Sequence, residues 1–164
     1  MRVLLVGAGC RGLCLTRELV AGGHSVRAVT RHEIGRERIE ASGAECWIGD
    51  PDVVGTLRYA LQNVTIVVWA LGTAAGTREQ VAALHGPRLE MMLTKTIDTT
   101  VRGIVYEAAG SVDVRVLAQG VETLRRVCGR NEIPCALVEA DPDDSPAWGA
   151  AARHAIDRLL GAVD

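Results

Sequence analysis

Residues 2–12 read RVLLVGAGCRG, an apolar run of strand length that leads directly into glycines spaced G-x-G-x-x-G. Residues 13–20 continue with helical character, so the order is strand, glycine turn and helix. A dinucleotide-binding crossover needs this order, because Gly7 allows the tight turn, Gly9 lets the backbone approach a pyrophosphate, and Gly12 lets the helix pack on the strand. We therefore expect a pyrophosphate at the start of this helix, where backbone N–H groups are unpaired.

The composition fits one domain and argues against two classes of partner. The 164 residues, 48% of them hydrophobic, are enough for one well-packed core, and we expect a single domain over 1–164 without a separate substrate domain. A net charge of -2 predicts no binding to nucleic acid or to an anionic membrane surface. No apolar run is long enough to span a membrane, and Met1 leads into the first strand without a signal-peptide pattern, so we expect a cytoplasmic protein.

The cysteines do not follow the pattern of a disulfide framework or a metal site. The chain has five of them, an odd number, and they are scattered without a C-x-x-C pair. They are Cys10, Cys14, Cys46, Cys128 and Cys135. Because disulfide frameworks and zinc sites use paired, closely spaced cysteines, we expect reduced thiols and no metal ion.

Hydrophobic patterning predicts strands that alternate with helices along the whole chain. Apolar or alternating runs predict strands over 3–6, 25–30, 44–48, 64–70, 103–108 and 135–139. Helical spacing predicts helices over 10–21, 33–42, 51–61, 77–100, 112–130 and 145–160, the fourth of them broken at Gly86-Pro87. Asp50 is expected to cap the third helix, with Pro51 as its first residue. This alternation predicts an α/β fold with a single doubly wound parallel sheet, a Rossmann fold, whose six strands follow the order 3-2-1-4-5-6 with helices on both faces.

The end of the second strand bears on the choice of cofactor. Sites that prefer NAD place an acidic residue there to accept hydrogen bonds from the adenosine ribose, whereas this chain has Thr30-Arg31-His32. Arg31 can pair with the 2′-phosphate of NADP through charge-assisted hydrogen bonds, and Arg36 and Arg38 follow closely in the sequence. The sequence therefore favours NADP as the cofactor, with NAD as the alternative. The competing interpretation of Arg31 is a solvated arginine on a loop.

Further residues are expected to line the same cofactor site. Cys10 and Arg11 lie inside the glycine motif, and Asp50 can contact the adenine edge in addition to its capping role. The residues that close the fourth strand are small enough to let the chain pass under the cofactor, and we expect them to flank its nicotinamide half. The complete predicted cofactor-binding set is Gly7, Gly9, Cys10, Arg11, Gly12, Thr30, Arg31, Asp50, Ala70, Leu71 and Gly72.

Several short segments together resemble one known family. They are residues 6–12, residues 23–26 with Arg31 after them, residues 43–45 with Gly49-Asp50, and Asn63-Val64 before the fourth strand. This combination resembles an atypical short-chain dehydrogenase/reductase of the NAD(P)-binding, epimerase-like or NmrA-like kind. The resemblance covers most of the chain and is clearest through Gly72. It implies a Rossmann fold with NAD(P) across the strand ends and a homodimer through the fourth and fifth helices.

The chain departs from that family at the catalytic positions. Active members carry a serine after the fifth strand and a Tyr-x-x-x-Lys pair at the next helix, in which the tyrosine is the acid and base. Here Ala108-Ala109 follow the fifth strand, with Ser111 beyond them. Neither Tyr59 nor Tyr106 is followed by a lysine, and the only lysine, Lys95, precedes the fifth strand. The standard catalytic set is therefore missing from these residues.

His85 and Tyr106 are the candidates for any other chemistry. His85 lies near the predicted helix break and could face the cleft, although a histidine in this position is more often a capping or surface residue. Tyr106 and Glu107 close the fifth strand, where ligands gather, so one of them is expected to line the pocket. Glu107 can alternatively pair with Arg102 or a neighbouring arginine. Cys10 lies at a helix start, which can lower the pKa of a thiol, but helix cysteines are more often buried.

Three functions remain compatible with these residues. The first is an NADP(H)-binding protein that acts as a cofactor sensor or regulatory module without ordinary dehydrogenase chemistry. The second is an NAD(P)-dependent oxidoreductase or epimerase that acts on a small-molecule substrate through nonstandard residues. The third is a regulatory nucleotide-binding domain like those that gate potassium transport. Arg31 counts against the third, because such domains usually carry an acidic residue at the second strand. The catalytic residues stay unknown from the sequence.

Overall fold

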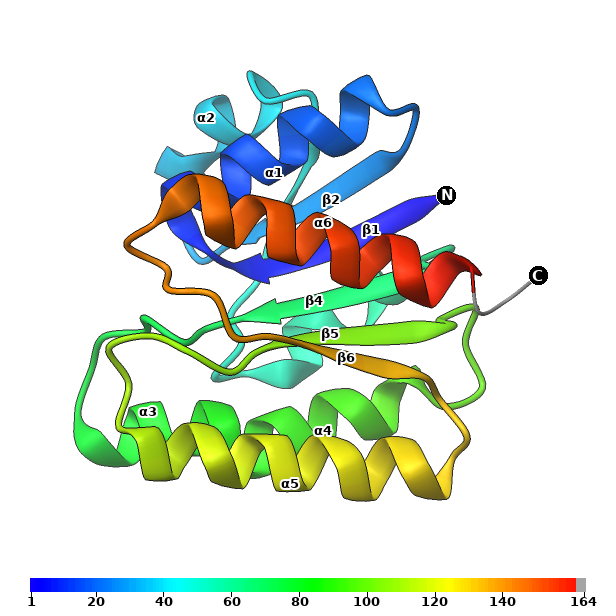
Figure 1. The fold of residues 1–164 in the computed structure, drawn as a ribbon. Helices are drawn as coiled ribbons and strands as arrows, with labels where there is room; N and C mark the ends of the chain where they lie inside the picture. Colours follow the sequence, from blue (N-terminus) through cyan, green and yellow to red (C-terminus); the bar gives the residue numbers. More distant parts are fainter. Residues whose placement is uncertain (162–164) are drawn as a thin grey trace.

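Six parallel strands form one sheet in the order β3-β2-β1-β4-β5-β6, and helices cover both of its faces (Figure 1). The computed structural model describes residues 1–161. The strands are β1 (Arg2–Gly7), β2 (Ser25–Thr30), β3 (Glu45–Ile48), β4 (Ile66–Ala70), β5 (Gly103–Glu107) and β6 (Cys135–Val138). The helices are α1 (Gly9–Ala21), α2 (Arg36–Glu40), α3 (Arg78–His85), α4 (Pro87–Thr96), α5 (Val114–Arg130) and α6 (Ser145–Gly161). The predicted fold class and strand order are confirmed.

The sheet separates two hydrophobic cores. Helices α1 and α6 pack on one face, and α3, α4 and α5 pack on the other (Figure 1). Successive side chains of a strand point to opposite faces, so Leu5 of β1 joins the core under α1 and α6, whereas Leu4 joins the core under α4 and α5. The central strand β4 is buried at every residue, which explains why its sequence is apolar without alternation.

The strand register brings the predicted site residues to one edge of the sheet. Gly7 at the end of β1 pairs with Ala70 at the end of β4, and Trp69 pairs with Tyr106 of β5. Because all the strands are parallel, the loops that follow them leave from the same carboxyl edge. Arg31, after β2, therefore lies on the same edge as the glycine motif.

The segment after β3 differs from the predicted helix. Instead of an α-helix over 51–61, the chain forms a turn and two short 3-10 helices, η2 (Val54–Leu57) and η3 (Tyr59–Leu61). The carboxylate of Asp50 accepts a hydrogen bond from the backbone N–H of Asp52 at 2.9 Å and so closes a side-chain turn rather than a helix cap. The glycine and valines that follow are poor helix formers. The prediction of Asp50 as a helix cap is therefore wrong.

The crossover between β4 and β5 is broken where the sequence predicted. Helix α3 ends at His85, and Pro87 is the first residue of α4, where a missing N–H costs nothing. Thr77 and Gln80 form a capping box at the start of α3. The predicted helix over 33–42 is shorter, because a 3-10 turn, η1 (Glu33–Gly35), precedes α2. No helix within residues 1–161 is long and apolar enough to cross a membrane.

Candidate functional site

The glycine turn between β1 and α1 has the backbone that its sequence suggests. Gly7, Ala8 and Gly9 have φ values of +91°, +69° and +49°, in the left-handed region. A Cβ at Gly7 would collide with the carbonyl oxygen of Ala70, and one at Gly12 would lie 2.9 Å from the Cβ of Ala8. A Cβ at Gly9 would meet nothing within 4 Å. Gly7 and Gly12 therefore serve close packing, whereas Gly9 leaves open space in front of the turn.

The amino end of α1 is free to receive an anion. Ala8 occupies the capping position and provides no side-chain hydrogen bond, and the first turn contains no acidic residue. The first N–H groups of a helix have no partners within the helix, and the helix dipole is positive at this end. A pyrophosphate placed over Gly9 would meet these donors without displacing a side chain that caps them.

Two cavities flank the glycine turn. The first, which we call the loop cavity, has a volume of about 250 Å³ and lies between residues 7–9, Arg31, Pro51 and the segments 70–71 and 73–75. The second, which we call the helix cavity, has a volume of about 200 Å³ and is lined by the end of β2 and by Arg38 of α2. Both cavities contact Gly7 and Gly9. The turn is therefore the wall that they share.

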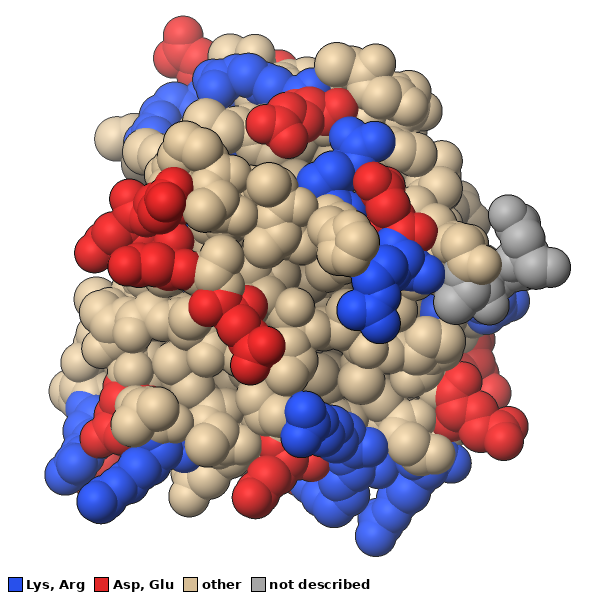
Figure 2. Space-filling view, in the orientation of Figure 1, with Lys and Arg blue, Asp and Glu red and all other residues tan. Residues whose placement is uncertain are grey.

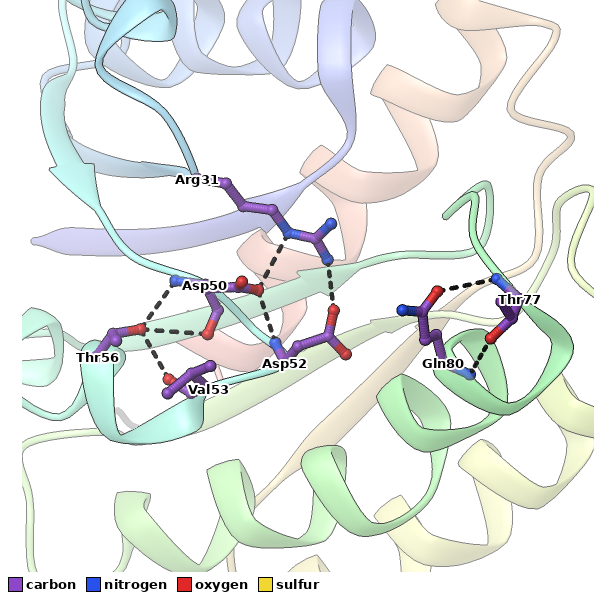
Figure 3. A network of polar contacts seen from close by, with 7 residues as sticks. All are labelled: Arg31, Asp50, Asp52, Val53, Thr56, Thr77 and Gln80. Atoms are coloured by element: carbon purple, nitrogen blue, oxygen red, sulfur yellow. Dashed lines mark hydrogen bonds and ion pairs between the residues drawn. The ribbon is translucent and has the colours of Figure 1, made fainter.

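Arg31 lies at the mouth of the loop cavity, as expected for the residue after β2, but its guanidinium is paired. Its Nε lies 3.1 Å from Oδ1 of Asp50, and its Nη2 lies 3.0 Å from Oδ2 of Asp52 (Figure 3). The two arginines that follow in the sequence, Arg36 and Arg38, have different partners. Arg36 pairs with two glutamates of its own segment, whereas Arg38 donates from Nη2 to the Cys10 thiol at 3.2 Å.

Arg11 does not extend its side chain over the glycine turn. Its Nη2 lies 2.5 Å from Oε1 of Glu107 and 3.2 Å from Oγ1 of Thr73, and its guanidinium stacks on Trp148 at 5.0 Å. The other oxygen of Glu107 accepts a hydrogen bond of 2.6 Å from the N–H of Gly72. Arg11 and Glu107 thus join the first turn of α1 to the carboxyl ends of β4 and β5.

The prediction that Glu107 pairs with Arg102 is wrong. Arg102 donates to the carbonyl groups of Thr99 and Val101 at the opposite end of β5. The sequence had also allowed Glu107 to pair with another neighbouring arginine, and Arg11 is that arginine. Only the strand order could have singled out Arg11, since 96 residues separate it from Glu107.

His85 and Tyr106, the two catalytic candidates, meet inside the core. Nδ1 of His85 lies 2.6 Å from the hydroxyl of Tyr106, and Nε2 lies 3.1 Å from the carbonyl oxygen of Leu71. Because the Leu71 carbonyl can only accept, Nε2 carries the proton and Nδ1 accepts from the Tyr106 hydroxyl. Burial lowers the pKa of His85 and raises that of Tyr106. Both side chains are buried, so the expectation of a capping or surface histidine is wrong.

Other residues of the predicted cofactor-binding set lie at the carboxyl ends of the strands. Thr30 ends β2, and its hydroxyl donates to the carbonyl of His32 at 3.3 Å. Ala70 and Leu71 line the loop cavity, and the carbonyl of Ala70 accepts a hydrogen bond of 2.8 Å from Ala8. Cys10 is exposed at the start of α1, so the alternative of a buried helix cysteine is wrong.

A third cavity of about 490 Å³, which we call the acidic cavity, lies at the ends of β5 and β6. Its lining residues are Thr73, Ala109, Gly110, Ser111, Glu139, Asp141, Pro142 and Asp143. Figure 2 shows acidic side chains gathered at this edge, over the loop between β6 and α6. Within residues 1–161, no three His, Cys, Asp or Glu side chains gather in a way that could hold a metal ion.

Comparisons with known proteins agree with this geometry. Residues 7–119 match the model of a family described as NAD(P)H-binding. The fold is similar to that of the UDP-glucuronic acid 4-epimerase from Bacillus cereus in complex with NAD, at 12% identity over 86% of this chain and 56% of that chain, with a TM-score of 0.70. It is also similar to the triphenylmethane reductase from Citrobacter complexed with NADP(H), at 17% identity over 85% of this chain and 49% of that chain, with a TM-score of 0.65.

A serine dehydrogenase from Escherichia coli is similar over more of its own length. Its identity is 20% over 94% of this chain and 90% of that chain, with a TM-score of 0.70. The chain spans about half the length of the epimerase and of the reductase. No curated protein matches the sequence significantly. At these identities the likeness to solved structures concerns the fold.

Proposed function

Since this chain belongs to the NAD(P)H-binding family, we propose that it binds NADP(H) in preference to NAD(H) across the carboxyl edge of its sheet. The observation that carries dinucleotide binding is the uncapped amino end of α1 behind Gly9, where a pyrophosphate has both donors and room. The preference for NADP(H) rests on Arg31, which lines the loop cavity and can contact a 2′-phosphate. The part of the loop cavity next to Arg31 and Pro51 would then take the adenosine half. Leu71 and Gly72 would flank the nicotinamide half.

We further propose that the cofactor is bound without the Tyr-Lys chemistry of ordinary short-chain dehydrogenases, so that the protein acts as a cofactor sensor or regulatory module. Tyr106 supports this proposal, because its hydroxyl is occupied by His85 inside the core. Tyr59 lies on η3, where its side chain is 71% exposed and outside the three cavities of the carboxyl edge. Lys95 lies in the last turn of α4, away from those cavities.

The second candidate is an oxidoreductase or epimerase that uses nonstandard residues. The acidic cavity favours it, because Ser111 and three carboxylates meet beside Thr73, which contacts Arg11 and also lines the loop cavity. A substrate there would adjoin the nicotinamide half of a dinucleotide bound at the glycine turn. The similarity to an epimerase and to a reductase supports the same candidate.

The remaining proposals concern the assembly and the location of the protein. We propose that residues 1–164 act as one cofactor-binding domain and that two copies pair through α4 and α5. On α4, Met91 is 43% exposed, which is consistent with a contact surface. The exposed thiols of Cys10 and Cys14 suit a reducing cytoplasm. Light scattering of the purified protein tests the dimer, and a monomer at micromolar concentration would contradict it.

Cofactor titrations test the proposed function. Calorimetry with NADPH and NADH should show tighter binding of NADPH, and Arg31→Ala should narrow the difference because it removes the partner of the 2′-phosphate. Absence of binding by both cofactors would overturn the proposal. Incubation of the protein with NADPH and a panel of carbonyl compounds separates the two candidates. A sensor leaves NADPH unoxidised, whereas turnover that falls on substitution of Ser111 would favour the enzyme.

A further inference from the structure

Arg31 lies between two carboxylates from the loop after β3. Its Nε lies 3.1 Å from Oδ1 of Asp50 and its Nη2 lies 3.0 Å from Oδ2 of Asp52, so one edge of the guanidinium is fully engaged (Figure 3). Pro51, between the two aspartates, lines the loop cavity together with Arg31. The ion pairs therefore lie at the wall of the proposed adenosine site.

The carboxylates of Asp50 and Asp52 differ in the hydrogen bonds that hold them in place. The backbone N–H of Asp50 donates to Oγ1 of Thr56 at 2.8 Å, its carbonyl accepts from Val53 at 2.9 Å, and its carboxylate accepts from the N–H of Asp52 at 2.9 Å. Within residues 1–161, the hydrogen bonds and ion pairs give the carboxylate of Asp52 no partner besides Arg31. Asp50 is thus held in place by the hydrogen bonds of its own turn. The carboxylate of Asp52 can move away from Arg31 without breaking any other hydrogen bond among the described residues.

The net charge of Arg31, Asp50 and Asp52 together disfavours the binding of a phosphate. One guanidinium and two carboxylates carry a net charge of -1, from +1 and two times -1. The paired edge of Arg31, formed by Nε and Nη2, is one of two edges that offer two parallel N–H groups to a phosphate, and Nη2 belongs to both edges. A 2′-phosphate therefore competes with Asp52 for Nη2, whereas an unphosphorylated ribose can donate its hydroxyls to the carboxylates without displacing either of them.

We propose that Asp52 is an internal competitor for the 2′-phosphate of NADP(H) and so determines how strongly the site prefers NADP(H) over NAD(H). This inference rests on the proposed function, in which Arg31 contacts the adenosine ribose. On binding, the phosphate takes Nη2 from Asp52, while Asp50 keeps Nε and holds the guanidinium in place. Since the side chains of Arg31 and Asp52 are 40% and 32% exposed, the pair is weak enough to be exchanged.

Adenosine 2′,5′-bisphosphate and adenosine 5′-monophosphate are the probes that isolate this subsite. Calorimetry compares their binding to the wild type and to Asp52→Asn. Removing the competitor should strengthen bisphosphate binding roughly three- to tenfold, the scale of an exposed ion pair together with one lost charge repulsion, and should leave monophosphate binding unchanged. Asp157→Asn is the matched control, because Asp157 is an exposed carboxylate paired with an arginine, Arg153, at 3.1 Å on α6. It should change neither affinity.

The Arg31→Ala background separates competition from general charge repulsion. There, Asp52→Asn should strengthen bisphosphate binding less than in the wild type, because the donor for which Asp52 competes is gone and only the lost repulsion remains. An undiminished gain in this background, or equal bisphosphate affinities for the wild type and Asp52→Asn, would overturn the inference and leave the proposed function standing. Failure of the wild type to bind NADPH, NADH and both probes would instead overturn the proposed function, and the inference with it.

Discussion

Arg11, in the first turn of α1, and Glu107, at the end of β5, are joined by an ion pair of 2.5 Å between Nη2 and Oε1. The side chain of Glu107 is 1% exposed and that of Arg11 is 11% exposed. Because Glu107 also accepts from the N–H of Gly72, the pair links the start of α1 to the carboxyl ends of β4 and β5. The floor of the proposed cofactor site is therefore held by charge as well as by packing.

Replacing Glu107 with glutamine should destabilise the protein. It leaves the guanidinium of Arg11 largely buried without its counter-charge, which costs about 3 kcal/mol by analogy with other broken buried pairs. Urea unfolding measures the loss. Arg11→Met should recover part of the stability in the Glu107→Gln background, because it removes the unpaired charge. Strictly additive effects of the two substitutions would contradict a direct pair.

Two glycines of α5 should respond in opposite directions to alanine. A Cβ at Gly120 would overlap the hydroxyl of Tyr106, which is hydrogen-bonded to His85, so Gly120→Ala should destabilise the protein by about 2 kcal/mol. A Cβ at Gly129, on the same helix, would meet nothing within 4 Å. Gly129→Ala should therefore stabilise the protein by about 0.5 kcal/mol through helix propensity. Thermal unfolding of both variants checks this, and equal shifts would argue against the tight packing at Tyr106.

The stability of the protein should fall as the pH decreases through about 6.5, in part because of His85. Burial lowers its pKa in the folded state below the ordinary value of 6.5, so the unfolded chain binds more protons in this range. The contribution of the neutral imidazole is fully present above pH 6.5 and is lost below it. Unfolding of the wild type should show a smaller free energy of unfolding at pH 5.5 than at pH 7.5. His85→Gln should show a smaller pH dependence, and an unchanged one would contradict this role.

The sequence predicted the sheet, and the edge at which the candidate site residues lie, because these depend on local patterns. Strands of apolar residues and the glycine motif are short-range features, and parallel connection rules then fix the strand order. The same reasoning brought Arg31 and Asp50 to one edge. It failed at residues 51–61, where the side chain of Asp50 accepts a hydrogen bond within a turn. An aspartate that closes such a turn cannot be distinguished in the sequence from one that caps a helix.

The contacts of the charged and titratable side chains were harder to predict. Arg11 with Glu107 and His85 with Tyr106 are pairs that only the folded chain creates, across 96 and 21 residues. The pairing of Arg31 with Asp52 was missed although the two lie close in the fold, because the predicted helix placed Asp52 in its first turn rather than beside β2. An acidic residue that follows the third strand was the available signal.

The affinity of Gly9→Ala for NADPH is the most direct measure of whether a dinucleotide binds over the glycine turn. Gly9 and Gly23, at opposite ends of α1, have φ values of +49° and +84°, and a Cβ at either would meet nothing within 4 Å. Both alanine variants should therefore lose about 1 kcal/mol of stability from backbone strain. Only Gly9→Ala should weaken NADPH binding, by roughly tenfold or more, because its methyl group would hold the pyrophosphate off the helix amides. Equal NADPH affinities for Gly9→Ala, Gly23→Ala and the wild type would contradict the account.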